Sequence, residues 1–512
     1  MAEDRQVRNR SLISNSKWNL VAFACALAAQ FAIVPFVIRW IGLAEFGRAG
    51  LVLAVWAPLM LIGTVLGQAT TREMSARLGS SGLPEAQRVF DTAILLCSAV
   101  CAVGGLVLFA AGPSILSALV GAAQPRQALR AAFLFAGIGW IAQQAILVLQ
   151  GACSARQDFR RIAQLGAFSA CATVLLTLAF TASAPSAEGY LAGVAASFVA
   201  SLLAWLWTSR TIALSRPRWP TLHRQELASL MHFGKWQSLA QLAGSFGNQI
   251  DRYALGALAP AIVVGQYNAA NRLQEAAYMG VMKAGEILFP HFAATANDEL
   301  ARREAFFLTA SWVVATVSAM FLAPLVPLAH SMLTLWVGPA TADGGAQLLR
   351  TLVLGGIVGC GSNVFTYYAM GTGQNAPVAW LSLTYALLTV LATIVLIVNF
   401  GPYAAGGGLL VASVVRVAAS LWLTRRLFFQ GLRWSSLLVS SVVPLLAGLA
   451  VALGLTATAL SEVAGWPALV AAYALAAIAV LVTNLILTAL WPVGRETVAR
   501  VISAARAHRA PG

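Results

Sequence analysis

The chain has 512 residues, of which 59% are hydrophobic and only 10% are charged, and its mean hydropathy of +0.78 excludes a soluble globular protein. The formal net charge of +15 would favour a nucleic-acid binder only with a clustered basic surface and motif support, which the sequence lacks. We therefore expect a polytopic membrane protein whose basic residues collect in cytoplasmic loops.

Apolar stretches long enough to cross a bilayer recur through the whole chain. Windows of about 20 residues predict an all-α polytopic membrane protein with about 14 transmembrane helices. The predicted spans are residues 18–38, 47–68, 90–111, 131–151, 163–183, 189–209, 233–255, 263–289, 305–328, 350–371, 378–399, 404–424, 436–458 and 468–491.

The distribution of basic residues predicts the orientation of these spans. With the N terminus placed in the cytoplasm, the inner segments collect 24 of the 33 Lys and Arg residues, and the outer segments collect 5. Because basic residues accumulate on the cytoplasmic side, both termini are expected to be cytoplasmic and the number of spans even.

A pattern of leucine, tryptophan and arginine at the end of the sixth span recurs 215 residues later, at the end of the twelfth. It favours two pseudo-symmetric halves in the same orientation, an architecture of transporters that move around a central site. The expected parts are an N-terminal six-helix lobe at residues 1–215, a cytoplasmic linker at 216–232, a C-terminal six-helix lobe at 233–430, two additional transmembrane helices at 431–494, and a basic cytoplasmic tail at 495–512.

The seventh and eighth predicted spans carry polar and charged residues in the middle of apolar sequence. At 100° per residue, each set falls on one helix face. A charge in hydrocarbon costs about 2.5 to 3.5 kcal/mol on insertion scales, so both faces are expected to line a water-filled interior. The residues are Gln237, Gln241, Asn248, Asp251 and Arg252 in the seventh span, and Asn268, Arg272, Glu275, Lys283 and Glu286 in the eighth.

The two spans run antiparallel, which brings their outer halves to a similar depth. Asp251 could then pair with Arg272, or Arg252 with Glu275. The alternative to a binding role is that such pairs only fix helix packing, although buried ion pairs often add little stability.

Three charged residues lie away from these pairs. Lys283 and Glu286 lie three residues apart in the inner half of the eighth span, where they can pair locally. Arg416, in the twelfth span, has no acidic neighbour in sequence and is the best candidate for an arginine that meets an anionic ligand.

Several classes of function are disfavoured by what the sequence lacks. No predicted loop is long enough for a catalytic domain, and no glycine-rich loop ends in Lys-Ser or Lys-Thr to hold a nucleotide phosphate. The five histidines and six cysteines lack the spacing of metal ligands. We therefore expect no enzymatic activity, no catalytic residues, no metal and no cofactor, and no binding of nucleic acid.

Several short motifs stand out in both halves of the chain. They are Trp40-Ile41-Gly42 and Phe46-Gly47 in the first half, and Asn248-Gln249-Ile250-Asp251-Arg252, Val264-Gly265-Gln266-Tyr267-Asn268-Ala269-Ala270 and Phe289-Pro290 in the second. These motifs resemble those of Wzx-type polysaccharide and oligosaccharide flippases, which belong to the multidrug/oligosaccharidyl-lipid/polysaccharide (MOP) exporter superfamily. The resemblance covers residues 10–430, and Arg48 departs from it because an aromatic residue is more usual there.

The resemblance implies a fold like that of multidrug and toxin exporters (MATE) and a location in the bacterial inner membrane. It implies an exporter that moves an undecaprenyl-pyrophosphate-linked oligosaccharide from the cytoplasmic to the periplasmic leaflet by alternating access. The glycan would serve O-antigen, capsule or exopolysaccharide synthesis. The partners implied are the lipid-linked oligosaccharide, membrane lipid, and polysaccharide polymerase and chain-length proteins.

The polar residues can be assigned roles under this resemblance. Proton or sodium coupling is a hypothesis, and each charge that moves inward gains about 2.3 kcal/mol per 100 mV of membrane potential. Asp251, Glu275 and Glu286 would orient the cations or exchange the coupling ion. The substrate-binding residues would be Arg252, Arg272, Lys283, Arg416, Asn248 and Asn268, because arginine matches phosphate oxygens bidentately and lysine acts as a point charge.

Alternative functions remain open. Fourteen spans resemble the architecture of lipid II flippases, but the first two spans lack the cationic pattern that is characteristic of that family, so lipid II ranks second among flippase substrates. An ion-coupled multidrug exporter would have an acidic cavity, which the interior cations disfavour. A membrane-bound polymerase or glycosyltransferase would carry a substantial outer loop, which the sequence does not provide.

Overall fold

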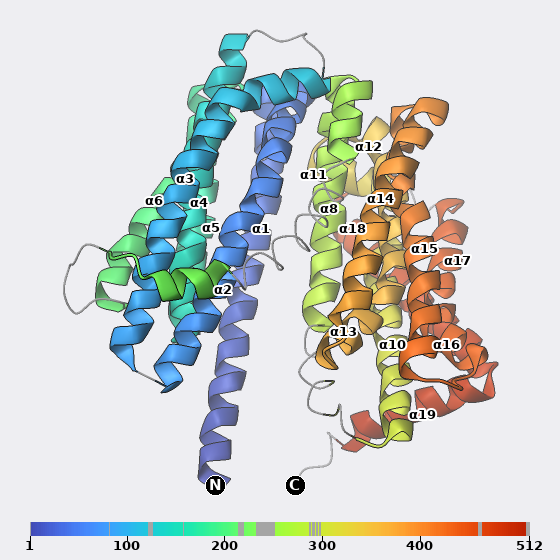
Figure 1. Ribbon diagram of the computed structural model, residues 1–512. Coiled ribbons are helices and arrows are strands. Elements are labelled where there is room, and N and C mark those ends of the chain that lie inside the picture. The colour runs from blue at the N-terminus through green and yellow to red at the C-terminus, as the bar shows by residue number, and fades with distance from the viewer. Residues whose placement is uncertain are drawn as a thin grey trace. The chain divides into compact units, whose positions relative to one another are not determined.

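The computed structural model describes residues 2–80, 82–120, 126–156, 158–212, 220–231, 251–285, 288, 292, 295, 298–458 and 463–507. In these residues all regular secondary structure is helical, as Figure 1 shows, and the predicted all-α class is confirmed. The chain divides into two compact units, Met1–Gln249 and Ile250–Gly512. The finer limits of the predicted lobes, linker and tail remain predictions.

Unit 1 consists of long helices joined by short connections. The 3-10 turn Ala57–Leu59 links the first two, and the fifth begins after Asp158, whose carboxylate accepts a hydrogen bond from the Arg161 backbone N–H at 3.3 Å. The helices are α1 (Ala2–Trp56), α2 (Met60–Ser80), α3 (Leu83–Val120), α4 (Arg126–Ala155), α5 (Phe159–Ser183) and α6 (Ala187–Ile212).

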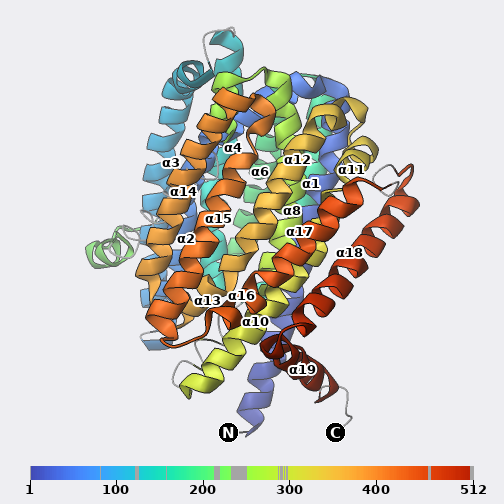
Figure 2. The same ribbon diagram turned by 90° about the vertical axis from the view of Figure 1, so that its right-hand side faces the viewer.

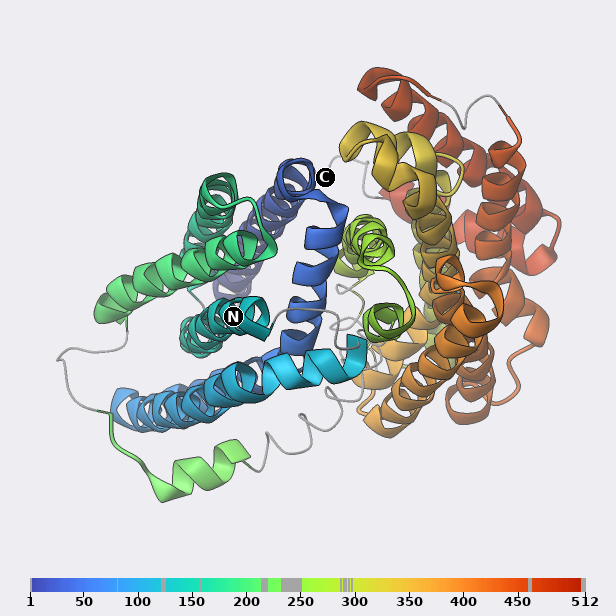
Figure 3. The same ribbon diagram turned by 90° about the horizontal axis from the view of Figure 1, so that it is seen from above.

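The predicted span at 18–38 and the start of the predicted span at 47–68 follow each other within one helix, α1. The chain stays helical through this stretch, and Gly42 alone has non-helical dihedrals, with φ 79° and ψ 165°. Glycine accepts this positive φ because it has no Cβ. Seen from above in Figure 3, the ribbon of α1 turns into a new direction partway along its length. The apolar stretch Phe31–Leu78 has 48 residues, more than twice the roughly 20 needed for one crossing.

Helices α2 and α4 approach each other closely at two glycines. Thr71 on α2 donates a side-chain hydrogen bond to the Gly151 carbonyl on α4 at 3.0 Å. A Cβ at Gly67 would lie 2.6 Å from the Leu147 carbonyl oxygen, and a Cβ at Gly151 would collide with the Gly67 backbone. The contact therefore depends on small residues, as is common between membrane helices.

We expect Gly151→Ala to destabilise unit 1 by about 1 to 3 kcal/mol, because the methyl group meets backbone atoms that cannot rotate away. Gly137→Ala on the same helix is the control, since its Cβ would make an ordinary 3.8 Å contact with the Gly105 carbonyl oxygen. Thermal unfolding of both variants in detergent checks this, and equal midpoints would contradict it.

The residues that follow α6 also pack on unit 1. Residues 224–231 are helical, and Leu230 is only 2% exposed in the core that α2, α3 and α4 share. Arg77 on α2 forms an ion pair with Glu226 at 3.2 Å, and the His223 backbone N–H donates to the Thr92 hydroxyl at 3.2 Å. Much of the predicted linker is thus anchored to unit 1.

Unit 2 contains more and shorter helices. Residues 251–258 are helical, and a π-helical turn, Thr424–Phe428, follows α15. The helices are α8 (Ala261–Gly285), α10 (Leu300–Leu322), α11 (Ala329–Trp336), α12 (Pro339–Gly359), α13 (Asn363–Gly371), α14 (Asn375–Phe400), α15 (Gly407–Leu423), α16 (Trp434–Ser441), α17 (Val443–Thr456), α18 (Trp466–Ala489) and α19 (Pro492–Ala507).

In the part of the chain that the structure describes, 10 helices are long and apolar enough to cross a membrane, or 11 with the bent pair α16 and α17. The protein is therefore a multi-pass membrane protein. The first two predicted spans form one continuous stretch here, and most of the seventh lies outside the described residues. Helix α8, at Ala261–Gly285, covers most of the eighth predicted span, but it is not among the helices that are apolar enough to be candidate membrane spans. The count of 14 stays a prediction.

The predicted span at 436–458 is bent in the structure, because α16 and α17 meet at an angle of 41°. Helix α17 begins at Val443 and carries Pro444 near its start. Proline has no N–H for the helical ladder and its ring clashes with the preceding turn, which accounts for the break.

A buried hydrogen-bond chain joins α18 to α10. The Trp312 indole N–H donates to the Thr488 hydroxyl at 3.0 Å, and that hydroxyl donates to the Asn484 carboxamide oxygen at 2.9 Å. The Asn484 amide in turn donates to the Thr316 hydroxyl. Because both Asn484 and Thr488 are fully buried, this chain specifies how the C-terminal helices dock.

We expect Asn484→Leu to destabilise the docking of α18 on α10 by about 1 to 3 kcal/mol, because it leaves buried hydroxyl groups without their amide partner. Asn399→Leu is the control, since the Asn399 amide donates only to the Val395 carbonyl of its own helix near the surface. In limited proteolysis, we expect faster cleavage between α17 and α18 in Asn484→Leu than in Asn399→Leu. Equal cleavage rates in the two variants would contradict the prediction.

Candidate functional site

The described members of the predicted site all lie in unit 2. Asp251 and Arg252 belong to the helical residues 251–258, while Asn268, Arg272 and Glu275 lie on α8 and Arg416 lies on α15. Helix α12 contacts both α8 and α15, and the three run side by side in Figure 2. Asn248, Glu286 and the Lys283 side chain lie outside the described residues, so the local Lys283–Glu286 pairing stays a prediction.

Asp251 is held by a tyrosine that the sequence analysis did not single out. The Tyr267 hydroxyl on α8 donates to Asp251 Oδ2 at 2.5 Å, and both side chains are buried. In the part of the chain that the structure describes, the second oxygen, Oδ1, has no hydrogen-bond partner. The site therefore contains a buried carboxylate with one strong donor and a second oxygen that is unpaired among the described residues.

Arg252 and Glu275 form the second of the two predicted pairings, which is confirmed. Arg252 Nη2 lies 3.7 Å from Glu275 Oε1, and the Asn271 amide donates to the same oxygen at 2.8 Å. The Arg252 side chain is 15% exposed and the Glu275 side chain 55%, so the pair reaches from the interior to the surface. Such a pair holds the arginine in place without removing it from water completely.

Arg416 lies in a second polar group. Its guanidinium stacks over the Tyr385 ring of α14, with Cζ 5.0 Å from the ring centroid. The Tyr278 hydroxyl on α8 donates to the Asn363 carboxamide oxygen at 3.3 Å and interacts electrostatically with Arg416. Among the described residues, no carboxylate lies within 4 Å of Arg416, and its buried Nε has no hydrogen-bond partner.

Helix α8 carries residues of both groups. Its Tyr267 donates to Asp251 and its Tyr278 donates to Asn363, so both groups lie along this helix in unit 2. Two buried amide nitrogens of unit 2, those of Asn268 on α8 and of Asn363, have no hydrogen-bond partner among the described residues. Free N–H donors beside a cation can bind oxygen atoms of phosphates and sugars.

The predicted polar face of α8 is joined by a second face that the sequence analysis missed. On the predicted face, Asn268 is buried at 4% exposure, whereas Glu275 is exposed. The missed face turns inward and consists of Tyr267, Asn271, Gln274 and Tyr278. Their spacing of four, three and four residues was the available signal, because it keeps them on one helix face.

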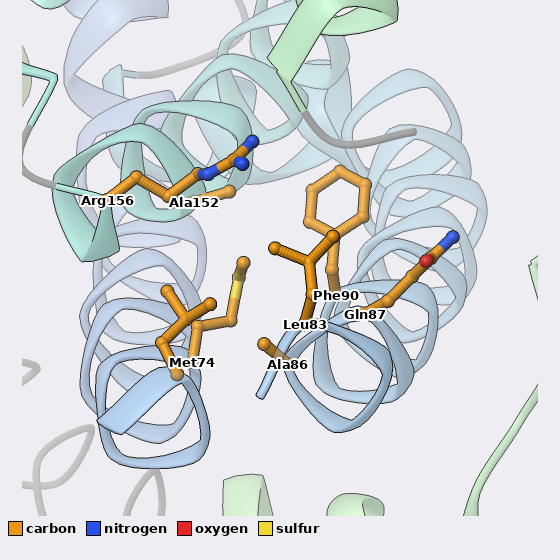
Figure 4. Close-up of a pocket in the computed structure, with 8 residues that line it drawn as sticks. Met74, Leu83, Ala86, Gln87, Phe90, Ala152 and Arg156 are labelled. Carbon is orange, nitrogen blue, oxygen red and sulfur yellow. The ribbon is translucent and has the colours of Figure 1, made fainter. Parts of the chain in front are cut away.

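A pocket in unit 1, shown in Figure 4, has different chemistry. It has a cavity volume of about 20 Å³, close to the space of one water molecule. Most of its wall is apolar, and only Gln87 and Arg156 bring polar atoms to it. A substrate headgroup does not fit there, and its lining residues are Met74, Leu78, Leu83, Ala86, Gln87, Phe90, Ala152 and Arg156.

Solved structures with the same fold are membrane transporters. An inward-facing multidrug resistance MATE family transporter of the MOP superfamily is 16% identical, with a TM-score of 0.68 over 80% of this chain and 97% of that chain. The lipid II flippase MurJ, inward closed, is 9% identical, with a TM-score of 0.73 over 93% of this chain and 98% of that chain. The predicted MATE-like fold is therefore confirmed.

A third structure differs in the character of its pocket. A MOP superfamily transporter from Pyrococcus furiosus, described by a reverse polarity of its binding pocket, is 17% identical, with a TM-score of 0.58 over 80% of this chain and 96% of that chain.

The sequence itself matches a family model. No curated protein sequence matches the chain significantly. Residues 12–296, more than half of the chain, match the model of the polysaccharide biosynthesis protein family, and the solved MOP transporters share the fold of this chain. The chain therefore belongs to the polysaccharide biosynthesis protein family, whose fold here is that of the MOP transporters.

Proposed function

We propose that the protein is a flippase of the bacterial inner membrane that carries an undecaprenyl-pyrophosphate-linked oligosaccharide from the cytoplasmic to the periplasmic leaflet. The observation that carries the proposal is Arg416, a cation stacked on Tyr385 without a carboxylate within 4 Å in the described part of the chain. A partly buried cation without a carboxylate partner favours an anionic ligand.

The arrangement suits a pyrophosphate that is attached to sugars. Stacking uses the face of the Arg416 guanidinium and leaves its N–H edge for phosphate oxygens. Arg252 provides a second cation, which Glu275 orients from the side. The amides of Asn268 and Asn363 then offer donors to sugar hydroxyls, while the prenyl chain stays in lipid.

Asp251 supplies a position for ion coupling under the same proposal. Its Oδ1 atom is available to a proton or a sodium ion, and Tyr267 fixes the opposite oxygen. Binding of a cation there changes the charge beside Arg252, which links the coupling ion to the affinity for an anionic headgroup. The membrane potential is a sufficient energy source at about 2.3 kcal/mol per charge and 100 mV.

Two related functions are weaker fits. Lipid II also carries a pyrophosphate, and the MurJ structure aligns with nearly the whole chain, so lipid II is the second candidate substrate. A cationic drug would meet Arg252 and Arg416 in unit 2, and like charges repel in an interior of low dielectric.

The experiment reconstitutes the full chain in proteoliposomes with a fluorescent lipid-linked oligosaccharide in both leaflets. A membrane-impermeant glycosidase added outside digests only the outer pool. We expect the wild-type protein to make the inner pool digestible, and lipid II in a parallel assay to move more slowly. Protection of the inner pool equal to that in empty liposomes would refute the proposal, and faster movement of lipid II would assign the alternative substrate.

A further inference from the structure

Two arginines at the end of α15 are each stacked on a tryptophan. The guanidinium of Arg425 lies over the Trp434 ring with Cζ 5.1 Å from its centroid, and that of Arg426 lies over the Trp422 ring at 4.9 Å. Both arginines belong to the π-helical turn Thr424–Phe428. An isolated π-helical turn is rare and is frequently found at functional sites.

Among the described residues, no acidic side chain forms an ion pair with these two arginines. Between Asp343 and Glu462 the sequence contains five arginines and no acidic residue. In the part of the chain that the structure describes, neither Arg425 nor Arg426 has a carboxylate within 4 Å. The two indoles remain accessible, with Trp422 47% and Trp434 40% exposed.

The surface lies where a membrane helix reaches the lipid headgroups. The candidate span Pro402–Phe428 ends within the π-helical turn. Helix α16 contacts α19, and Figure 2 shows both at the same end of unit 2. Exposed tryptophan is typical of the headgroup level, and basic residues beside it attract anionic lipid.

We propose that Arg425 and Arg426, framed by Trp422 and Trp434, form a binding site for the phosphate of an anionic membrane phospholipid. Each indole engages the face of one guanidinium and holds it in position, and the N–H edge stays available for bidentate contact with phosphate oxygens. The exposed indoles also cover the first part of the acyl chains. This site is separate from the polar region around Arg416 and does not depend on the proposed substrate.

The test compares lipid retention by the full chain, purified in a neutral detergent. Native mass spectrometry with phosphatidylglycerol or phosphatidylcholine measures the bound lipid. The double variant Arg425→Gln/Arg426→Gln is expected to bind phosphatidylglycerol about 30-fold more weakly than the wild type, because each arginine near a headgroup contributes roughly a fivefold gain. Binding of phosphatidylcholine should not change.

Arg39→Gln is the matched control, because Arg39 is exposed beside the 40% exposed Trp40 in unit 1. It should leave the retention of phosphatidylglycerol unchanged, and an equal loss would show a generic charge effect and overturn the site. Trp422→Leu/Trp434→Leu keeps both charges and changes only exposed side chains, so folding is not at risk. We expect an intermediate loss, and unchanged retention would overturn the role of stacking.

Competition with glycerol phosphate distinguishes a site for a whole phospholipid from a site for any phosphate anion. Glycerol phosphate at millimolar concentration should not displace phosphatidylglycerol, since it lacks the acyl chains that the indoles contact. Displacement of the lipid by glycerol phosphate would overturn the proposal that the ligand is a phospholipid.

Discussion

Arg416→Gln is expected to reduce transport of the lipid-linked oligosaccharide by roughly 10- to 100-fold, because hydrogen bonds to a charged group contribute about 1.5 to 3 kcal/mol. The substitution removes the cation and keeps a side chain that can pack on Tyr385. The proteoliposome assay gives the rate, and surface glycan in a strain that depends on this protein gives an independent measure.

A loss of transport by Arg416→Gln is informative only if the variant still folds and inserts into the membrane. Arg416→Lys keeps the charge and should recover only part of the rate, since lysine is a point charge without the planar fork. Arg302→Gln is the control, because Arg302 is 79% exposed and forms a surface pair with Asp298 that contributes little. Wild-type transport by Arg416→Gln would remove Arg416 from the site.

The class of fold was predictable because a bilayer imposes a simple requirement on sequence. Every backbone polar group in lipid must be paired within its own helix, so long apolar windows identify spans. Helix α8 shows the limit of that rule. Its buried face carries the polar residues Gln266, Asn268, Asn271 and Gln274. Helices α10 and α12 contact α8, so these residues face protein and not lipid.

The candidate site was predictable in part, and the reason lies in the helical period. The pairing of Arg252 with Glu275 follows from antiparallel helices and from charge, both of which the sequence contains. Tyr267 was missed because it is one residue, or 100°, away from Asn268, and both positions are polar. Periodicity alone cannot rank two adjacent polar faces, whereas their burial in the fold can.

Local backbone breaks were less predictable than helices. The predicted spans at 18–38 and 47–68 imply a break between them, and the structure places the change of direction at a single residue, Gly42. The bend before Pro444 follows from proline chemistry, but its angle depends on how α16 and α17 pack in unit 2. Sequence therefore locates such breaks better than it predicts their geometry.

We expect Tyr267→Phe to lower both the stability of the protein and its transport rate, although the substitution removes only one oxygen atom. It removes the donor 2.5 Å from Asp251 Oδ2 and leaves a buried carboxylate without that hydrogen bond. A buried polar group that loses its partner costs about 1 to 3 kcal/mol, and more when it is charged. We expect a lower thermal midpoint in detergent and at least a tenfold loss of transport.

The double variant Tyr267→Phe/Asp251→Leu separates stability from function. Removal of both partners leaves no unpaired carboxylate, so stability should return most of the way to that of the wild type. Transport should not recover, because the proposed ion-coupling oxygen Asp251 Oδ1 is gone. If the double variant is less stable than Tyr267→Phe alone, Asp251 contributes packing or other contacts that outweigh this hydrogen bond. If it transports normally, Asp251 has no part in coupling and the potential must act through another charge.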